Sequence, residues 1–389
     1  MNRIYLDHGA TSPLRVEARE AMLRHLVEPQ ANPSSIHAPG HRARMTIETA
    51  RERIARLLGA TADEIVLTGG GSEANNLALF GRALSAGPGY RQVVTSGFEH
   101  PSVLAVMEDL AARGFEVVRV APGRDGIVRS AHLLEAVTPA TCLVSLMLAN
   151  NEVGTLQPVG ELAGILRERR ILLHSDAAQA VGKVPVDVRT LGVDLMTVAA
   201  HKFGGPQGAG ALYVRQGVRL HPHLRGGGQE LNRRPGTENV AAIAGFGAAA
   251  EAAARGMSEE AARVAALRDR LEERMRREIP GLRVNGADAP RVPGVSSVAI
   301  DGATGEGLVI ALDLEGVAVS AGAACSAGTI RRSATLAAMG LHDEAGRSIR
   351  VSLGPQTGPE EIDEFIRRLK DVVTLMRGAS SSRQLQAVS

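Results

Sequence analysis

Lysine is scarce in this chain, and one of its few lysines has surroundings that suit covalent chemistry. Among 44 lysine and arginine residues, only Lys183, Lys202 and Lys370 are lysines. Arginine does not act as an amine nucleophile because its guanidinium stays protonated. Lys202 lies in the glycine-rich stretch Ala200–Gly208, directly after a predicted strand over 194–198. A partly desolvated lysine at such a strand end could lose its proton near neutral pH and attack an aldehyde.

The other two lysines are weaker candidates. Lys183 precedes Val184-Pro185 in what we expect to be an exposed connection, and Lys370 lies on the final amphipathic segment. The alternative interpretation of Lys202 itself is an ordinary solvated lysine on a surface loop.

A carboxylate and an amide follow another predicted strand. Asp176 and Gln179 come directly after the apolar run 171–173. A carboxylate there could face the ring nitrogen of a pyridine cofactor and keep it protonated, so that the ring accepts electrons. Gln179 could hydrogen-bond the ring hydroxyl. A helix N-cap is the simpler alternative for Asp176.

A glycine turn joins the predicted strand 64–68 to a predicted helix. Gly69, Gly70 and Gly71 precede Ser72. Glycines allow close backbone approach, and the N–H groups at a helix start bind phosphate. The stretch has neither a dinucleotide-binding nor a Walker pattern, and a plain loop is an equally good interpretation.

The two cysteines have different surroundings. Cys325 stands among small residues in Ser320–Gly328, a setting for an exposed, mobile nucleophile, whereas Cys142 opens an apolar run and is predicted to be a core residue. A buried structural thiol is the alternative for Cys325. Two cysteines make no disulfide framework, so both are expected as thiols.

Composition excludes several classes of protein. The chain has 389 residues, 44% of them hydrophobic, a net charge of +2 and only 2% aromatic residues. Basic clusters interleaved with stacking rings are missing, so we expect no direct nucleic-acid contact. Because the sequence has no apolar run of about 18 residues and no signal-peptide core at Met1–Asp7, we expect a soluble, cytoplasmic protein without membrane contact.

Alternating strand and helix patterns predict an α/β fold with a mainly parallel, doubly wound sheet. The predicted strands are 64–68, 92–95, 115–118, 142–147, 171–174, 194–198 and 211–214, and the predicted helices lie near 72–86, 101–113, 130–137 and 159–170. The Ala-rich stretch 238–278 predicts one or two long helices. A smaller α+β region follows, with strands near 295–300, 317–320 and 349–353, a closing helix over 359–377, and a frayed tail from 378.

These segments together resemble the NifS/IscS-type cysteine desulfurases, in the class V aminotransferase group of pyridoxal-phosphate enzymes. The resemblance spans nearly the whole chain, with the motifs in the family's order and spacing. Besides the stretches above, the matching blocks are 5–11, 32–37, 99–100, 150–155, 234–239 and 348–354.

The resemblance implies a fold-type I architecture. Its large domain, 16–252, would hold a mainly parallel seven-stranded sheet between helices. A small α+β domain formed by 1–15 and 253–377 would carry the catalytic cysteine loop, and 378–389 would be a flexible tail. The implied activity removes sulfur from L-cysteine, giving L-alanine and a persulfide on Cys325.

The resemblance also assigns roles to cofactor residues. Lys202 is similar to the lysine that holds pyridoxal phosphate covalently, His100 to the imidazole stacked on the ring, and Asp176 to the partner of the ring nitrogen. Gln179 and Asn151 match groups near the ring oxygen and the substrate.

Further matches concern the phosphate. Gly71, Ser72 and His201 match phosphate contacts. Thr237 matches a phosphate contact from the other subunit, which implies a homodimer.

Substrate and sulfur-transfer roles follow from the same resemblance. Asn32 and Asn151 match substrate-binding positions, and Arg350 matches the arginine that binds the substrate carboxylate. Cys325 matches the nucleophile that passes sulfur to an iron–sulfur scaffold or another acceptor protein, and it could also be a transient iron–sulfur ligand. Lys202 and His100 are the expected proton-transfer groups.

Departures from the family pattern affect cofactor affinity and partner choice. Ala199 replaces a usual serine near the phosphate, Ala323 a frequent serine near Cys325, Gln207 a lysine, and Pro355 a common arginine. The rival predictions are a plain class V aminotransferase, a selenocysteine lyase, or a non-catalytic protein that kept the fold. No resident metal is expected, because His221-Pro222-His223 suggests no third ligand.

Overall fold

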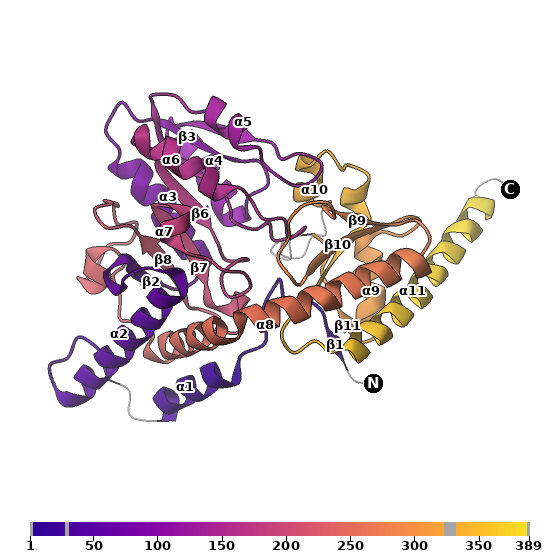
Figure 1. The fold of residues 1–389 in the computed structure, drawn as a ribbon, viewed down its shortest axis with the longest axis horizontal. Coiled ribbons are helices and arrows are strands. Elements are labelled where there is room, and N and C mark those ends of the chain that lie inside the picture. Colours follow the sequence, from indigo (N-terminus) through magenta and orange to yellow (C-terminus); the bar gives the residue numbers. More distant parts are fainter. Residues whose placement is uncertain (1–2, 28–30, 323–331, 387–389) are drawn as a thin grey trace.

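A seven-stranded sheet forms the centre of the larger part of the molecule (Figure 1). The computed structural model describes residues 3–27, 31–322 and 332–386, with side chains through 378. The strands run in the order β2-β8-β7-β6-β5-β3-β4, and only β8 is antiparallel to its neighbours. Their bounds are β2 (Ile65–Thr68), β3 (Gln92–Ser96), β4 (Glu116–Val120), β5 (Thr141–Ser145), β6 (Leu172–Asp176), β7 (Leu195–Ala199) and β8 (Gly210–Val214). The predicted mainly parallel sheet is confirmed.

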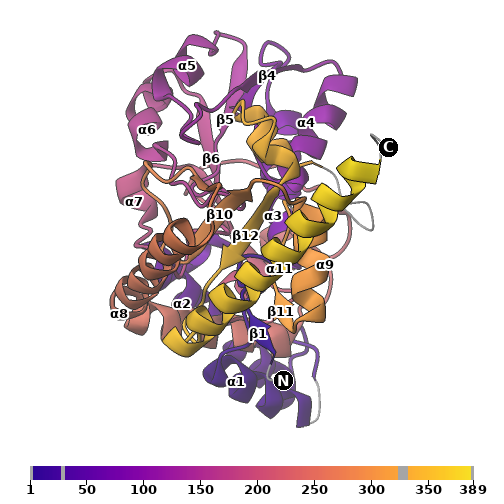
Figure 2. The same ribbon diagram turned by 90° about the vertical axis from the view of Figure 1, so that its right-hand side faces the viewer.

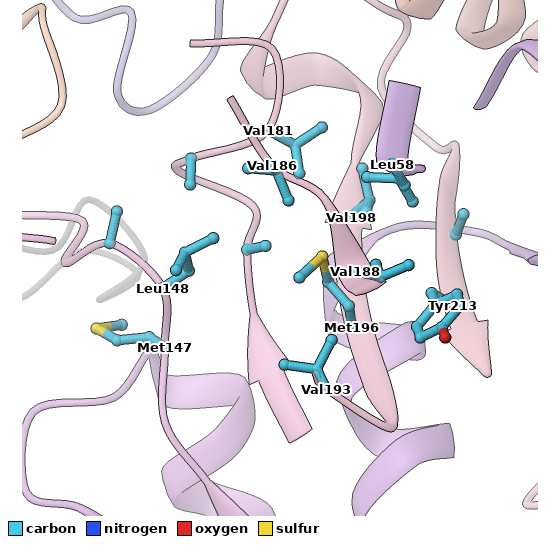
Figure 3. Packing of buried hydrophobic residues seen from close by; sticks show 14 of the residues in the cluster. Leu58, Met147, Leu148, Val181, Val186, Val188, Val193, Met196, Val198 and Tyr213 are labelled. Carbon is cyan, nitrogen blue, oxygen red and sulfur yellow. The ribbon is translucent and has the colours of Figure 1, made fainter. Parts of the chain in front are cut away.

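Helices cover both faces of this sheet because its central strands are apolar on both sides. They are α1 (Val16–Val27), α2 (Ala38–Leu58), α3 (Gly71–Ser85), α4 (Pro101–Ala112), α5 (Ser130–Glu135), α6 (Val159–Glu168) and α7 (Val188–Leu191). Two buried apolar clusters lie on the two faces. Figure 3 shows part of one, with Leu58 of α2, Val198 of β7 and Tyr213 of β8. Cys142 is fully buried in β5, as predicted.

A single long helix, α8 (Val240–Glu278), connects the two parts of the molecule (Figure 1). The segment lacks proline, so nothing interrupts the helix. A Cβ on Gly247 would lie 2.6 Å from Ala50 Cα, so only glycine permits this close approach to α2. Farther along α8, Leu271 and Met275 are buried in a separate apolar cluster. The expected boundary at 252–253 thus falls inside a continuous helix.

The second part is built on antiparallel strands. β9 (Leu282–Asn285), β10 (Val295–Ile300) and β12 (Ser348–Ser352) form a sheet in the order β12-β10-β9, and β1 (Ile4–Tyr5) pairs in parallel with β11 (Val317–Ala318). Ile4 and Leu6 therefore join the cluster of the second part. Short 3-10 turns are η1 (Ala62–Glu64), η2 (Ala200–Lys202), η3 (Gln229–Asn232) and η4 (Glu344–Gly346).

Three helices complete this part: α9 (Gly305–Leu314), α10 (Ala334–Ala338) and α11 (Pro359–Gln386). α11 packs on α9 (Figure 2). It continues past the predicted end at Arg377 to Gln386, the last described residue, because no glycine or proline follows Gly378 to stop it. Among the described residues, no helix combines the length and apolar character needed to cross a bilayer.

Candidate active site

A cavity of about 220 Å³ opens where the carboxyl ends of the sheet strands meet the second part. Ligands of open α/β sheets bind at this edge, because the loops that follow parallel strands converge there. The residues that line it are Gly9, Ala10, Gly71, Ser72, Asn75, His100, Ser102, Met147, Ala149, Asn151, Asp176, Ala178, Gln179, Ala199, His201, Lys202 and Arg350. Nine of the predicted site residues are therefore in one place: Gly71, Ser72, His100, Asn151, Asp176, Gln179, His201, Lys202 and Arg350.

Lys202 reaches the cavity from η2, directly after β7. Its Nζ donates hydrogen bonds to the carbonyl oxygens of Gly9 and Ala10, both at 2.9 Å. Behind it, the chain turns at Gly204 with a φ of 89°, where a Cβ would lie 2.5 Å from Arg15 Cγ, so glycine is required. A reactive amine is thus held at the cavity wall by backbone carbonyls.

Asp176 ends β6 and turns its carboxylate toward the cavity. Oδ2 accepts from Asn75 Nδ2 at 2.7 Å and Oδ1 from the Ala178 N–H at 3.0 Å. The Asn75 amide also donates to Ser102 Oγ at 2.9 Å, and Ser102 Oγ lies 2.8 Å from His100 Nδ1. A single buried amide therefore links the predicted ring-nitrogen partner to the predicted stacking imidazole.

His100 is the N-cap of α4. Its Nδ1 accepts from the Ser102 backbone N–H at 3.2 Å. Because a backbone N–H only donates, Nδ1 carries no proton and a neutral ring has its hydrogen on Nε2. The cap thereby fixes both the tautomer and the ring orientation.

The start of α3 offers backbone donors to a phosphate. The N-cap is Gly70, which has no side chain to occupy the first N–H groups of the helix. His201 lies nearby, with Nδ1 at 2.8 Å from Thr11 Oγ1. Burial first, and then the charges of Lys202 and Lys183, lower the pKa of His201 to about 4. Its imidazole is therefore neutral at pH 7.

Arg350 reaches the cavity from β12 in the second part. Its guanidinium donates to the Asn151 carbonyl at 2.8 Å and to Asp7 Oδ1 at 2.7 Å, and its side chain is only 4% exposed. Nε is buried without a hydrogen-bond partner among the described residues. This unused donor suits a carboxylate ligand.

Gln179 and Lys183 form a chain behind Lys202. Gln179 Nε2 donates to the Gly9 carbonyl at 2.8 Å, and Lys183 Nζ donates to Gln179 Oε1 at 2.8 Å. The prediction that Lys183 lies in an exposed connection is wrong, because the turn after β6 folds back beside Lys202 and leaves Lys183 partly buried. Burial, followed by the charges of Lys202 and Arg350, lowers the pKa of Lys183 to about 7.

Two buried titratable groups, Glu99 and His174, lie close enough to Asp176 for its charge to act on them. Burial raises the pKa of Glu99 to about 8, although its Oε1 accepts from Ser96 Oγ and the Met147 N–H. His174 lies between Ser145 and Thr197, and burial lowers its pKa to about 4. Both groups are uncharged at pH 7, so Asp176 is not repelled by a second carboxylate.

Cys325 lies outside the described residues. On its N-terminal side, Ser320 exchanges backbone hydrogen bonds with Arg350. On its C-terminal side, Ser333 donates to Glu152 Oε2 at 2.5 Å, and a Cβ on Gly322 would lie 3.7 Å from that same oxygen. The described residues that flank the cysteine segment therefore lie beside the wall of the site.

Two predicted site residues are not in this cavity. Asn32 is exposed between α1 and α2, where Oδ1 accepts from the Ser34 N–H at 2.9 Å and closes its own turn. Thr237 is exposed in the connection before α8. His221 bonds Arg225 and His223 stacks on Phe80, and the described residues hold no cluster of three or more metal-ligating side chains.

Residues missed by the sequence analysis complete the site. Asn75, Ser102, Thr11 and Asp7 each fix a predicted residue, and Lys183 fixes Gln179. Asn75 lies four residues after Gly71, about one turn along α3, and this spacing is the local sequence feature that places it beside the cavity.

Comparison with known proteins decides the family. The aminotransferase class-V family matches residues 4–365. The chain belongs to this family. It is 42% identical to cysteine desulfurase IscS of Dictyoglomus turgidum, over 98% of this chain and 97% of that protein, and 43% identical to a cysteine desulfurase of Cereibacter sphaeroides, over 98% of each.

Solved structures agree with this class-V assignment. A NifS-like protein has a TM-score of 0.90 at 34% identity, covering 96% of this chain and all of that one. The structure described as SspA in complex with cysteine has a TM-score of 0.80 at 33% identity, covering 91% of this chain and all of that one. The fold is that of the type I pyridoxal-phosphate enzymes.

The described residues fit pyridoxal phosphate, the cofactor of class-V enzymes. An amine, a carboxylate and uncapped helix N–H groups line one cavity, which are the partners that an aldehyde, a pyridine nitrogen and a phosphate need. Gly71 leaves little spare room there, because a Cβ on it would lie 3.3 Å from Ala199 Cβ.

Proposed function

We propose that this protein is a cytoplasmic, homodimeric cysteine desulfurase that passes sulfur to a protein acceptor. The observation that supports this most directly is one cavity lined by Lys202, Asp176 and Arg350. An amine, a ring-nitrogen partner and a carboxylate-binding guanidinium together suit an amino-acid substrate. The cysteine desulfurase relatives cover nearly the whole chain, which favours L-cysteine as that amino acid.

Pyridoxal phosphate, when bound, supplies an aldehyde and an electron-accepting ring. Lys202 would hold it covalently and Asp176 would pair with the ring nitrogen, while His100 would lie against the ring. Asn151 and Gln179 would lie near the ring oxygen.

The phosphate would be bound at the start of α3 by Gly71 and Ser72, with a hydrogen bond from the neutral His201 imidazole. We propose that Thr237 of a second protomer adds a further contact. The exposed side chains of Val27, Ile36 and Leu231 favour such a second copy, which would cover them.

Arg350 would bind the carboxylate of L-cysteine. Its guanidinium is already oriented by Asp7 and the Asn151 carbonyl, so little side-chain entropy is lost on binding. Asn151 would position the substrate from the opposite wall, and we retain Asn32 as a substrate contact only in the assembled dimer.

Sulfur transfer would use the Cys325 thiolate. The thiolate attacks the substrate sulfur, an S–S bond forms, and the C–S bond breaks with its electron pair left on carbon. Protonation of that carbon and return of the α-proton that Lys202 had taken give L-alanine, and Cys325 keeps the sulfur as a persulfide. Lys202 would take the α-proton of the substrate, and His100 would donate or accept protons at these steps.

The persulfide would then supply sulfur for iron–sulfur cluster assembly or another thiolation. An acceptor protein with its own nucleophilic thiolate would receive it, because thiol exchange needs an attacking thiolate. Transient binding of an iron–sulfur cluster by Cys325 is part of the same proposal.

Cys325→Ala tests the proposal. This variant should keep the visible absorbance of a lysine-bound cofactor but release no alanine from cysteine, and wild-type protein should carry a persulfide on Cys325 by mass spectrometry. Borohydride should trap the cofactor on Lys202. Wild-type sulfide release by the variant would contradict the assignment, and a protein that takes up no pyridoxal phosphate would sink it entirely.

A plain aminotransferase and a selenocysteine lyase are the rivals. An aminotransferase would give pyruvate-type keto acids and no sulfide, and a lyase would prefer selenocysteine over cysteine. Alanine, sulfide and keto-acid yields from the two substrates separate the three activities.

A further inference from the structure

Lys183 is placed beside the cofactor machinery without touching the main cavity. It lies in the turn after β6 and lines a second, smaller cavity of about 50 Å³ behind Lys202. Lys202 lines both cavities. The second cavity is otherwise mainly apolar, with Phe203, Val295 and Leu353 among its walls. A lysine retained here, in a chain with only three lysines, needs an explanation other than solvation.

The geometry gives that explanation through Gln179. The Gly9 carbonyl can only accept, so the Gln179 atom 2.8 Å from it must be the amide nitrogen. The Lys183 amine donates to the other end of the same amide, Oε1, at 2.8 Å. These two contacts leave the amide one orientation. Gly9 also accepts from Lys202 Nζ at 2.9 Å, so both side chains share one carbonyl.

We propose that Lys183 is a positioning residue of the cofactor site: its amine holds the Gln179 amide so that the N–H group faces Gly9 and Lys202. In the reversed orientation, the Gln179 carbonyl oxygen would face the Gly9 carbonyl oxygen. The site would then lose the Gln179 N–H donor that the ring oxygen of the cofactor needs. This inference rests on the proposed function, because it concerns how the cofactor is held.

The electrostatic setting agrees with this role. Among the described residues no carboxylate forms a salt bridge with Lys183. Lys202, His201 and Arg350 face it from the cofactor side. From the smaller cavity it is faced by His8 and by the ion pair of Arg15 with Glu260.

Burial, and then the charges of Lys202 and Arg350, lower the pKa of Lys183 to about 7. Lys183 therefore loses its proton near neutral pH. The ammonium form can only donate to Gln179, whereas the neutral amine also has a lone pair and can accept. The hold of Lys183 on the Gln179 amide should therefore weaken as pH rises through about 7.

Lys183→Met is the primary test, because methionine is unbranched and has neither charge nor donor. In full-length protein, dialysis should show roughly 5- to 20-fold weaker binding of pyridoxal phosphate, which is the loss of one or two hydrogen bonds. In wild-type protein this affinity should fall as pH rises through about 7, and Lys183→Met should lack that step. Lys370→Met, which removes the exposed lysine of α11, is the matched control and should change neither quantity.

Further variants separate the effect of the Lys183 hydrogen-bond donor from the effect of its side-chain size. Lys183→Arg and Lys183→Gln each keep a donor, with and without the charge, and should recover most of the affinity. Lys183→Leu keeps neither and replaces Lys183→Met if that variant does not fold. If Lys183 acts through Gln179, then Lys183→Met should add nothing to the affinity loss of Gln179→Ala.

Unchanged affinity in Lys183→Met, or in Lys183→Leu if Lys183→Met does not fold, would overturn the inference, as would losses that multiply in the double variant. Failure of the proposed function looks different. There, wild-type protein would itself take up no cofactor or form no alanine, whereas failure of the inference leaves wild-type protein active and the Lys183 variants identical to it.

Discussion

Asn75 Nδ2 donates to Asp176 Oδ2 at 2.7 Å, and the same amide nitrogen donates to Ser102 Oγ at 2.9 Å. Asn75 is 1% exposed, so water cannot replace it without a rearrangement. One buried side chain therefore orients both groups expected to contact the cofactor ring, Asp176 directly and His100 through Ser102.

Asn75→Ala should weaken binding of pyridoxal phosphate by roughly 10-fold or more, because a buried carboxylate that loses a donor costs about 1–3 kcal/mol. Asn75→Asp should bind still less, since it places a second carboxylate against Asp176. Equilibrium dialysis measures both. Asn285→Ala is the control: it removes a buried amide that bonds Ser297 and Ser348, none of which lines the cavity, and should lower stability without changing cofactor affinity.

Ala199→Ser should tighten cofactor binding several-fold. Ala199 lines the cavity at the end of β7, against the glycine that opens α3, and a hydroxyl there would add a phosphate donor. Ala199→Val is the contrasting variant: its extra methyl groups would crowd Gly71 and should weaken binding. Dissociation rates of the cofactor, followed by visible absorbance, measure the difference. If Ala199→Ser does not slow dissociation and Ala199→Val does not speed it, Ala199 does not face the phosphate.

Glu99 should make stability depend on pH. The folded state keeps this proton until about pH 8, whereas an ordinary glutamate loses it near 4.5. Between these values the unfolded chain binds fewer protons, so the free energy of unfolding should fall as pH rises, by an amount on the order of 5 kcal/mol. Glu99→Gln removes this titration and should show a flatter profile in urea denaturation from pH 5 to 8.5. Parallel profiles for the two proteins would mean that Glu99 is charged in the fold.

Gly354→Ala should destabilise the joint between the N-terminal segment and β12. A Cβ on Gly354 would lie 2.1 Å from His8 Nδ1, which is far too close for two non-bonded heavy atoms. We expect a loss of about 2 kcal/mol or more in the free energy of unfolding. His8→Ala combined with Gly354→Ala should recover part of it. Gly358→Ala, whose Cβ would meet the flexible ends of Glu360 and Glu361, should be nearly neutral. Calorimetry of wild-type protein and of these three variants measures the change in stability.

The local hydrophobic pattern predicted the central sheet and the helices between its strands. Short apolar runs such as 142–147 and 194–198 predict buried strands, and the longer helix-like segments that alternate with them predict crossovers, so a mainly parallel sheet follows from periodicity. Asp176 and Lys202 each follow a predicted strand, and they line one cavity because the carboxyl ends of parallel strands meet at one edge.

Tertiary structure alone decided which residues hold those groups. Asp7 pairs with Arg350 across 343 positions, and Thr11 meets His201 across 190. These contacts exist because β1 pairs with β11 and Asp7 bridges Ser352. Such non-local pairing leaves no mark in a local sequence pattern.

Lys183 shows the same limit over a shorter distance. Its sequence neighbours suggested solvent, yet the turn after β6 returns it to Lys202. Hydrophobic periodicity and residue type were sufficient to predict the sheet, its active edge and the reactive amine. The orientation of the amides, the partner of the guanidinium and the protonation of buried groups depend on which distant segments exclude water together, and only the folded chain sets that.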